Sequence, residues 1–388
     1  MNLCLGKIIS CPSLQGDYNQ MKEFFSKIKI LDLYIFKKYI FTFFFTVLLF
    51  TMISVVIDFS EKVEDFLHEA CTAHQILFDY YLNFIPYINW LLWPLISLIA
   101  VIFFSSRMAH NSEIISVFNA GISFRRMQIS FLVPAILITM IHLFGNHYMI
   151  PLANKERLDF EHTYIHKNND KGKTENVHLF VSKDTKVYLK FINKNDKTAR
   201  DFRVEKFKDS DLVYILKAKS AEWDPKTLKW KLSNIEERSF NGLKETIHVD
   251  KSGTRELKLN LSPDDFVQYI NQKEMLTSLE LLDYVEKENE RGSGIAKPFE
   301  IEFHRRTADS ISIIILTLIG TAVATRKVRG GMGLHLAIGI GLGAIYVFLS
   351  RFSITFAQND SLPSVIGVWI PNLFFIGVAI YLNSKAQK

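Results

Sequence analysis

Six stretches without Asp, Glu, Lys or Arg constrain this chain more than any other feature of its sequence. They cover residues 39–57, 80–106, 127–154, 310–325, 330–350 and 361–384. A helix needs about 20 largely apolar residues to cross the hydrocarbon core of a membrane, which is roughly 30 Å thick. Helices in soluble cores usually carry charge on their outer face. The pattern therefore predicts six membrane-spanning helices, the fourth of which is expected to extend back to about Thr307.

The charged residues are gathered between the third and fourth stretches. Of the 46 Lys and Arg residues, 30 lie between Lys155 and Arg306, and so do 28 of the 40 Asp and Glu residues. The remainder of the chain has the composition of a membrane protein. We therefore predict an α-helical polytopic membrane protein, with three helices before a charged inserted domain and three after it.

The inserted domain is expected to consist of β-strands. Short alternating runs separated by turn residues, a pattern typical of strands, occur at residues 177–181, 186–192, 202–207, 212–223, 228–235 and 256–261. A turn is expected at 193–196. Asp224 and Pro225 favour a hairpin, because proline presets φ and aspartate suits the first turn position. Strands without intervening helices predict an antiparallel sandwich or an open roll.

The predicted organisation has five parts. They are an N-terminal segment, three spans, a β domain, a helix with a linker, and three more spans, at residues 1–38, 39–154, 155–275, 276–306 and 307–384. Thr277 and Glu280 form a capping box for a helix that ends near Arg291. Met21 resembles a start residue, so residues 1–20 are interpreted as an extension that precedes the true start.

The basic residues of the short loops predict the orientation, because cytoplasmic loops carry an excess of Lys and Arg. The segment 1–38, the loops after spans 2 and 4 and the C-terminus together hold 14 basic and four acidic residues. The loop 58–79 holds one lysine and six acidic residues. Both termini are therefore expected in the cytoplasm, and the β domain on the other side of the membrane.

The sequence carries no motif for covalent catalysis. It contains no G-x-x-x-x-G-K-[ST] phosphate loop, no G-x-S-x-G elbow and no H-E-x-x-H zinc motif. The three cysteines, Cys4, Cys11 and Cys71, form neither a disulfide framework nor a C-x-x-C pair. We expect no enzymatic activity, no metal site and no cofactor in this chain.

The loop after the second span contains the most informative pattern. Asn111 and Ser112 favour a helix start, Glu113 suits a first turn, and Gly121 favours a helix end. The predicted helix, residues 112–120, carries an apolar patch made of Ile114, Ile115, Val117 and Phe118. This patch either docks on a partner or lies against the membrane surface or the chain's own helices.

The fifth span contains a glycine face. Gly339 and Gly343 form a G-x-x-x-G pattern, which lets two helices approach closely. The pattern fits close packing within the chain, and it also fits a contact that slides or opens.

These motifs resemble the LptF/LptG permease family, the membrane subunits of the lipopolysaccharide exporter. The resemblance begins near Ile30 and covers nearly the whole chain. It depends on the run Ile30-Leu-Asp-Leu-Tyr-Ile35, which is closer to LptG than to LptF. It also depends on Ser112-Glu-Ile-Ile115, on Asn119-Ala-Gly-Ile-Ser123, and on the division of six spans by a β domain.

The resemblance implies a transporter subunit of the bacterial inner membrane, with its β domain in the periplasm. It would pair with an LptF-like permease, bind an LptB-like ATPase dimer that holds ATP and Mg²⁺, and lie beside an LptC-like protein. The family's jellyroll domain passes lipopolysaccharide to a periplasmic bridge of similar folds. The segment with Glu113, Ile114, Ile115 and Phe118 matches the family's ATPase-coupling helix. Gly339 lies in a span that matches a lateral-gate helix.

The chain departs from the resemblance at the outer end of the first span. Well-known members carry basic residues there, which suit lipid phosphates. Here the region is acidic, and Lys62 is its one positive charge. Head-group contacts are therefore expected at Lys62, or at Arg305 and Arg306 beside the fourth span.

Two other functions compete with this one. The first is a different ABC-type permease, for lipoprotein release or mechanical work, but such permeases usually have four spans. The second is a membrane sensor with a ligand-binding β domain. It would need a cytoplasmic signalling domain, and the loops are too short to hold one.

Overall fold

We describe a computed structural model of the chain. The structure describes residues 30–68, 71–165, 175–193, 197–208, 211–242, 244–259, 261–263, 271–291, 296–325, 331–359 and 361–386. Four predicted features therefore lie wholly or largely outside the described residues. These are the N-terminal extension, the turn at 193–196, the joint after Arg291 and the basic loop after the fourth span.

The six predicted spans are confirmed as six helices long and apolar enough to cross a membrane. The first three are α2 (Ile30–His68), η1 with α3 (Gln75–Tyr81, Leu82–His110), and α5 continued by η2, α6 and η3 (Phe124–Phe144, Gly145–Met149, Ile150–Phe160, Glu161–Ile165). The last three are α9 (Lys297–Ala324), α10 (Gly331–Gln358) and α11 (Ser364–Ala386).

Several of these helices extend beyond the charge-free stretches. α2 begins at Ile30 rather than Tyr39, and the third helix continues to Ile165, inside the segment predicted as β domain. Two of the charges in the extensions of α2 are paired with residues of the third span. Asp32 binds Arg126, and Lys62 binds Glu161. Because such pairs offset the cost of holding charge in a helix bundle, the helices continue past the apolar residues.

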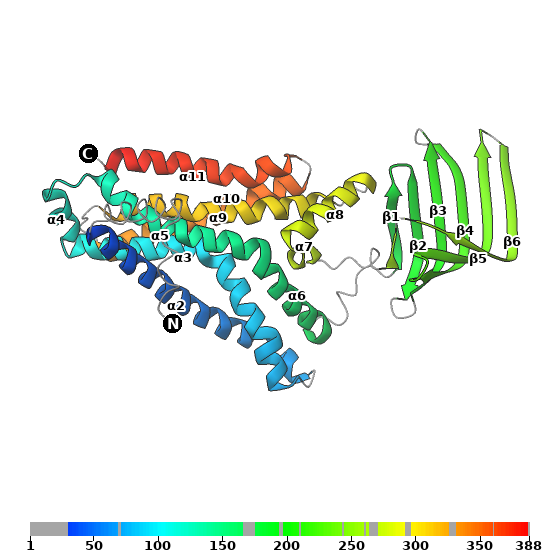
Figure 1. Ribbon diagram of the computed structural model, residues 1–388, viewed down its shortest axis with the longest axis horizontal. Coiled ribbons are helices and arrows are strands. Elements are labelled where there is room, and N and C mark those ends of the chain that lie inside the picture. The colour runs from blue at the N-terminus through cyan, green and yellow to red at the C-terminus, as the bar shows by residue number, and fades with distance from the viewer. Residues whose placement is uncertain are drawn as a thin grey trace, which may run out of the picture.

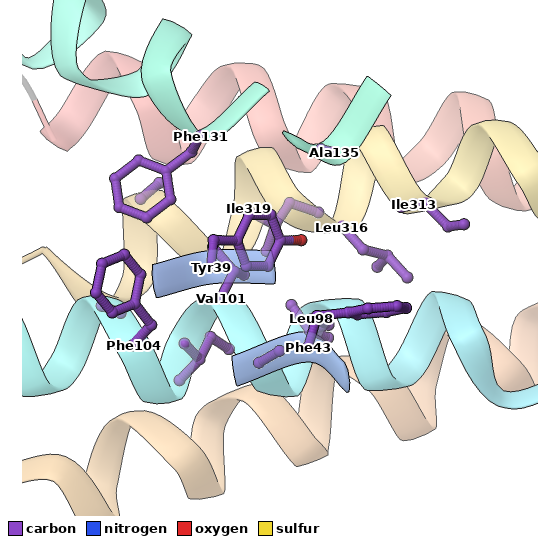
Figure 2. Packing of buried hydrophobic residues seen from close by; sticks show 14 of the residues in the cluster. Tyr39, Phe43, Leu98, Val101, Phe104, Phe131, Ala135, Ile313, Leu316 and Ile319 are labelled. Atoms are coloured by element: carbon purple, nitrogen blue, oxygen red, sulfur yellow. The ribbon is translucent and has the colours of Figure 1, made fainter. Parts of the chain in front are cut away.

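The helices form one bundle with α9 at its centre. In the most apolar window of α9, 67% of the residues are buried, compared with 6% in α2. Figure 2 shows side chains of α2, α3, α5 and α9 meeting in the core. The labelled residues are Tyr39, Phe43, Leu98, Val101, Phe104, Phe131, Ala135, Ile313, Leu316 and Ile319. Most of the α2 surface therefore remains open for lipid or for another subunit.

The inserted all-β domain is confirmed and lies at one end of the bundle (Figure 1). Its six antiparallel strands pair in chain order. They are β1 (Glu175–Ser182), β2 (Thr185–Asn193), β3 (Thr198–Lys208), β4 (Asp211–Asp224), β5 (Lys229–Asn241) and β6 (Lys244–Leu257). Residues of β1 and β6 line one hollow, so the sheet curls. The described strands thus form an open roll in one sheet, without the two facing sheets of a sandwich or the crossovers of a complete jellyroll.

The last strand differs from its prediction. It was expected at 256–261, but β6 ends at Leu257 and begins at Lys244. The first half of β6 is exposed on both faces, including Ile247 and Val249. A strand segment without a buried face needs no alternation of apolar and polar residues. The first half of β6 therefore could not be recognised as a strand from its sequence.

The return to the membrane follows the predicted capping box. Thr277 donates its hydroxyl and its backbone N–H to Glu280, at 2.9 and 2.7 Å, at the start of α8 (Ser278–Arg291). The short α7 (Gln272–Met275) precedes it. These two helices connect the sheet to α9.

Candidate functional site

The predicted loop helix is present as α4 (Glu113–Asn119). It lies at the end of the bundle opposite the sheet, together with the start of α2 and the end of α11 (Figure 1). Gly121 has φ +80° and donates its N–H to the carbonyl of Phe118 at 2.9 Å, as expected of a glycine that ends a helix. Ser112, before the helix, has φ +61° and makes no side-chain cap.

The apolar residues of α4 divide into two faces. Ile114 is 1% exposed in the bundle core, and Val117 packs against the same core. Ile115 and Phe118 are 43% and 38% exposed. The alternative of packing on the chain's own helices therefore holds for one face, and docking of the other face on a partner stays a prediction. One face packs on the chain's own helices, and the other is open to a partner.

Glu113 stands at the start of this open face. Its carboxylate accepts hydrogen bonds from the Tyr34 hydroxyl at 3.0 Å and from the Asn111 amide at 3.3 Å. The side chain is half-buried. Of the four predicted docking residues, Glu113, Ile115 and Phe118 are accessible, whereas Ile114 anchors the helix from below.

The glycine face of α10 packs against α3 of the same chain. A Cβ on Gly339 would lie 2.2 Å from Cδ1 of Ile102, and one on Gly343 would lie 3.0 Å from Cδ2 of Leu95. Gly320 of α9, which the sequence analysis did not single out, meets Val101 in the same way at 2.4 Å. The contact is thus close packing in this structure, and its opening remains a prediction.

Gly339→Leu is expected to lower stability by about 1–3 kcal/mol, because the added side chain overpacks a filled contact. Gly341→Leu on the same helix is the matched control, since a Cβ there meets nothing within 4 Å. Thermal unfolding in detergent measures both. Equal shifts in Tm for the two variants would contradict this account of the glycine face.

Lys62 is held by acidic neighbours. Its ammonium lies 3.0 Å from Asp58 and 2.8 Å from Glu161, and it also contacts the Tyr80 hydroxyl. Arg157 binds the same Glu161 at 2.9 Å. The acidic end of α2 is therefore part of an ion-pair network that joins α2 to the second and third spans.

Arg305 and Arg306 also have partners within the chain. Arg305 binds Glu302 at 2.8 Å. Arg306 is 4% exposed and donates to the Leu276 carbonyl at 2.9 Å and the Ser278 hydroxyl at 3.1 Å. This side chain fastens the segment before α8 onto α9.

A small cavity of about 40 Å³ adjoins these arginines and is lined in part by Glu274. Burial, and then the nearby charge of Glu302, raise the pKa of Glu274. Glu302 and Asp309 line the same cavity, together with Arg305 and Arg306. This cluster of charged side chains holds α7 against the bundle.

The concave face of the sheet forms a larger hollow of about 620 Å³. Apolar side chains from four strands or their flanks line its floor, and charged side chains lie at its rim. The apolar residues are Val181, Val204, Leu216, Leu257 and Leu259, and the charged ones are Lys206, Glu237, Arg255 and Lys258. An amphipathic ligand with an apolar chain fits this arrangement.

Three residues at the α4 end were missed as site residues. Asp32 accepts two hydrogen bonds from Arg126, and Tyr34 binds Glu113. Asp32 and Tyr34 both belong to the run Ile30–Ile35, which is the signal that could have drawn attention to them. Among the described residues, no group of three or more His, Cys, Asp or Glu could hold a metal ion.

Among the described residues, six apolar helices, an inserted sheet and a short helix with one exposed face define a multi-pass membrane protein. The sequence model of the "Lipopolysaccharide export system permease LptF/LptG" family matches residues 33–385, and the chain belongs to that family. It is 20% identical over 364 residues to the lipopolysaccharide export system permease protein LptG of Escherichia coli K12, covering 91% of this chain and 97% of that protein. It is likewise 20% identical over 369 residues to LptG of Haemophilus influenzae, covering 93% and 99%.

Proposed function

We propose that this chain is the LptG-like permease subunit of an ABC-type exporter in the inner membrane. It extracts lipopolysaccharide from the membrane and passes it to a periplasmic bridge of similar β fold. The observation that carries this proposal is α4, whose accessible residues Glu113, Ile115 and Phe118 lie at the end of the bundle opposite the sheet. Family membership supports the substrate.

Energy for export comes from a separate LptB-like ATPase dimer, which binds ATP and Mg²⁺. This chain contains no phosphate-binding loop of its own. The α4 helix docks on the ATPase through its open face, while Ile114 and Val117 transmit the contact to the bundle. The basic residues of the short loops support a cytoplasmic position for this end of the bundle.

An LptF-like second permease and an LptC-like protein complete the membrane complex. The outward faces of α2 and α10 support this part of the proposal, because they carry large exposed apolar side chains. Among them, Phe41 is 72% exposed and Phe348 is 66% exposed. Lipid and subunit contacts both suit such faces in a membrane.

The lipid leaves the membrane along the concave side of the sheet. The apolar floor of the 620 Å³ hollow suits acyl chains, and its charged rim suits a polar head group. Lys62, Arg305 and Arg306 are proposed head-group contacts nearer the membrane. Because each is paired with an acidic side chain, a lipid phosphate has to compete with Glu161 or Glu302 for them.

Depletion of the chain from growing cells tests the proposal. Newly made lipopolysaccharide should then accumulate at the inner membrane and decline at the outer membrane. Restoring the wild-type chain should reverse both changes. An unchanged distribution of lipopolysaccharide between the two membranes would refute the proposed function.

A further inference from the structure

The first turn of α2 is tied to the third span by a bidentate ion pair. Arg126 donates from Nη1 and Nη2 to the two carboxylate oxygens of Asp32, at 2.8 and 2.6 Å, and Ser130 donates its hydroxyl to the same carboxylate. Bidentate arginine–carboxylate pairs fix orientation as well as distance. The start of α2 therefore has a defined position against α5.

The same turn of α2 is tied to α4. The Tyr34 hydroxyl donates to Oε2 of Glu113 at 3.0 Å, across 79 residues of sequence. The Tyr34 ring packs 6.4 Å from the ring of Phe104 on α3, so the side chain lies between α2, α3 and α4. A hydrogen bond to an ionised carboxylate is stronger than one between neutral groups.

These two ties bracket the loop that contains α4. Glu113 is the first residue of α4, and Arg126 lies in the first turn of α5. Farther along α2, its most apolar window is only 6% buried. A displacement of α4 is therefore passed to the first turn of α2, which these hydrogen bonds hold in place. The rest of α2 is lightly packed against the bundle.

We infer that Asp32 and Tyr34 are positioning residues that transmit movement of α4 to the first membrane helix. The inference rests on the proposed function, because it assigns to α4 the contact with the ATPase. Tyr34 orients the Glu113 carboxylate and couples it to α2. Asp32 and Arg126 keep the start of α2 from slipping against α5 when α4 moves.

The test uses the whole exporter complex, purified with its ATPase and reconstituted in proteoliposomes that contain lipopolysaccharide. Tyr34→Phe removes only the hydroxyl, at a position that is 37% exposed, so folding should be retained. The variant should keep the ATPase and its rate of ATP hydrolysis. Lipopolysaccharide released per ATP should fall about tenfold, because a hydrogen bond to a charged group is lost. Asp32→Asn should lower the same ratio.

Tyr148→Phe is the matched control. Tyr148 is an exposed tyrosine on the third span, and its hydroxyl has no hydrogen bond within the part of the chain that the structure describes. Its release per ATP should equal that of the wild type. In the double variant Tyr34→Phe with Glu113→Gln, the loss should be smaller than the sum of the two single losses, because both changes weaken the same hydrogen bond.

Two outcomes would overturn the inference. One is wild-type release per ATP in Tyr34→Phe, and the other is loss of the ATPase from that variant, which would make Tyr34 part of docking rather than transmission. Failure of the proposed function has a different signature. In that case, Glu113→Ala would retain both the ATPase and lipid release.

Discussion

Glu113→Ala is expected to separate the partner ATPase from the purified membrane complex. Glu113 is the charged residue at the start of the open face of α4, and we expect it to be one of the few interface residues whose loss costs about 2 kcal/mol or more of binding free energy. A loss of about that size weakens affinity roughly thirtyfold. Copurification of the ATPase with a tagged permease measures the effect. Glu61→Ala is the control, since Glu61 is exposed at the far end of α2.

Two further substitutions in α4 separate docking from folding. Phe118→Ala removes an exposed ring and should weaken ATPase binding without lowering Tm. Ile114→Ala removes a fully buried side chain and should cost about 2–5 kcal/mol of stability. If Glu113→Ala and Phe118→Ala both retained the ATPase, the open face of α4 would not be the docking surface.

Arg306→Ala is expected to destabilise the chain by about 3–5 kcal/mol, because it leaves buried Glu302 with one cation fewer and the Leu276 carbonyl without its donor. Arg305→Ala should cost less, since Arg305 is more exposed and Arg306 still binds Glu302. Thermal unfolding of the purified chain measures both. Arg306 is therefore expected to act mainly by stabilising the fold, through its contacts with Glu302 and Leu276.

The same two variants test the head-group proposal. A variant of Arg305 or Arg306 that folds normally but loses lipid-stimulated ATP hydrolysis would support contact with lipid. Unchanged lipid stimulation in the double variant Arg305→Ala with Arg306→Ala would remove both residues from the proposed lipid site. A wild-type Tm in Arg306→Ala would contradict the structural role.

Features that depend on neighbours in sequence could be predicted. The six spans follow from apolar length, α8 from the Thr277–Glu280 capping box, and the end of α4 from Gly121. Each signal is contained within one helix and its flanking residues. The order of three spans, β domain and three spans follows from these local signals.

Features that depend on distant partners could not be predicted. The first turn of α2 is held by an ion pair between Asp32 and Arg126, which are 94 residues apart. Lys62 was expected to contact a lipid head group, and the structure places it beside Glu161, 99 residues away. No pattern within a short segment contains this information.

The two faces of α4 raise a related difficulty. Ile114 and Ile115 are adjacent and chemically identical, yet one is buried and the other is exposed. In a helix of two turns with apolar residues on several sides, the periodicity is too short to choose the inner face. Which of the two isoleucines is buried depends on the side of α4 that faces the helix bundle.

The central claim is that α4 couples ATP hydrolysis by a partner to the release of lipopolysaccharide by this chain. Proteoliposomes that contain the purified exporter complex and lipopolysaccharide test it most directly, with release to a soluble β-domain acceptor as the measured quantity. The account predicts ATP-dependent release with the wild-type chain and none above background with Glu113→Ala. Equal ATP-dependent release from both, or none from the wild type in an active complex, would contradict it.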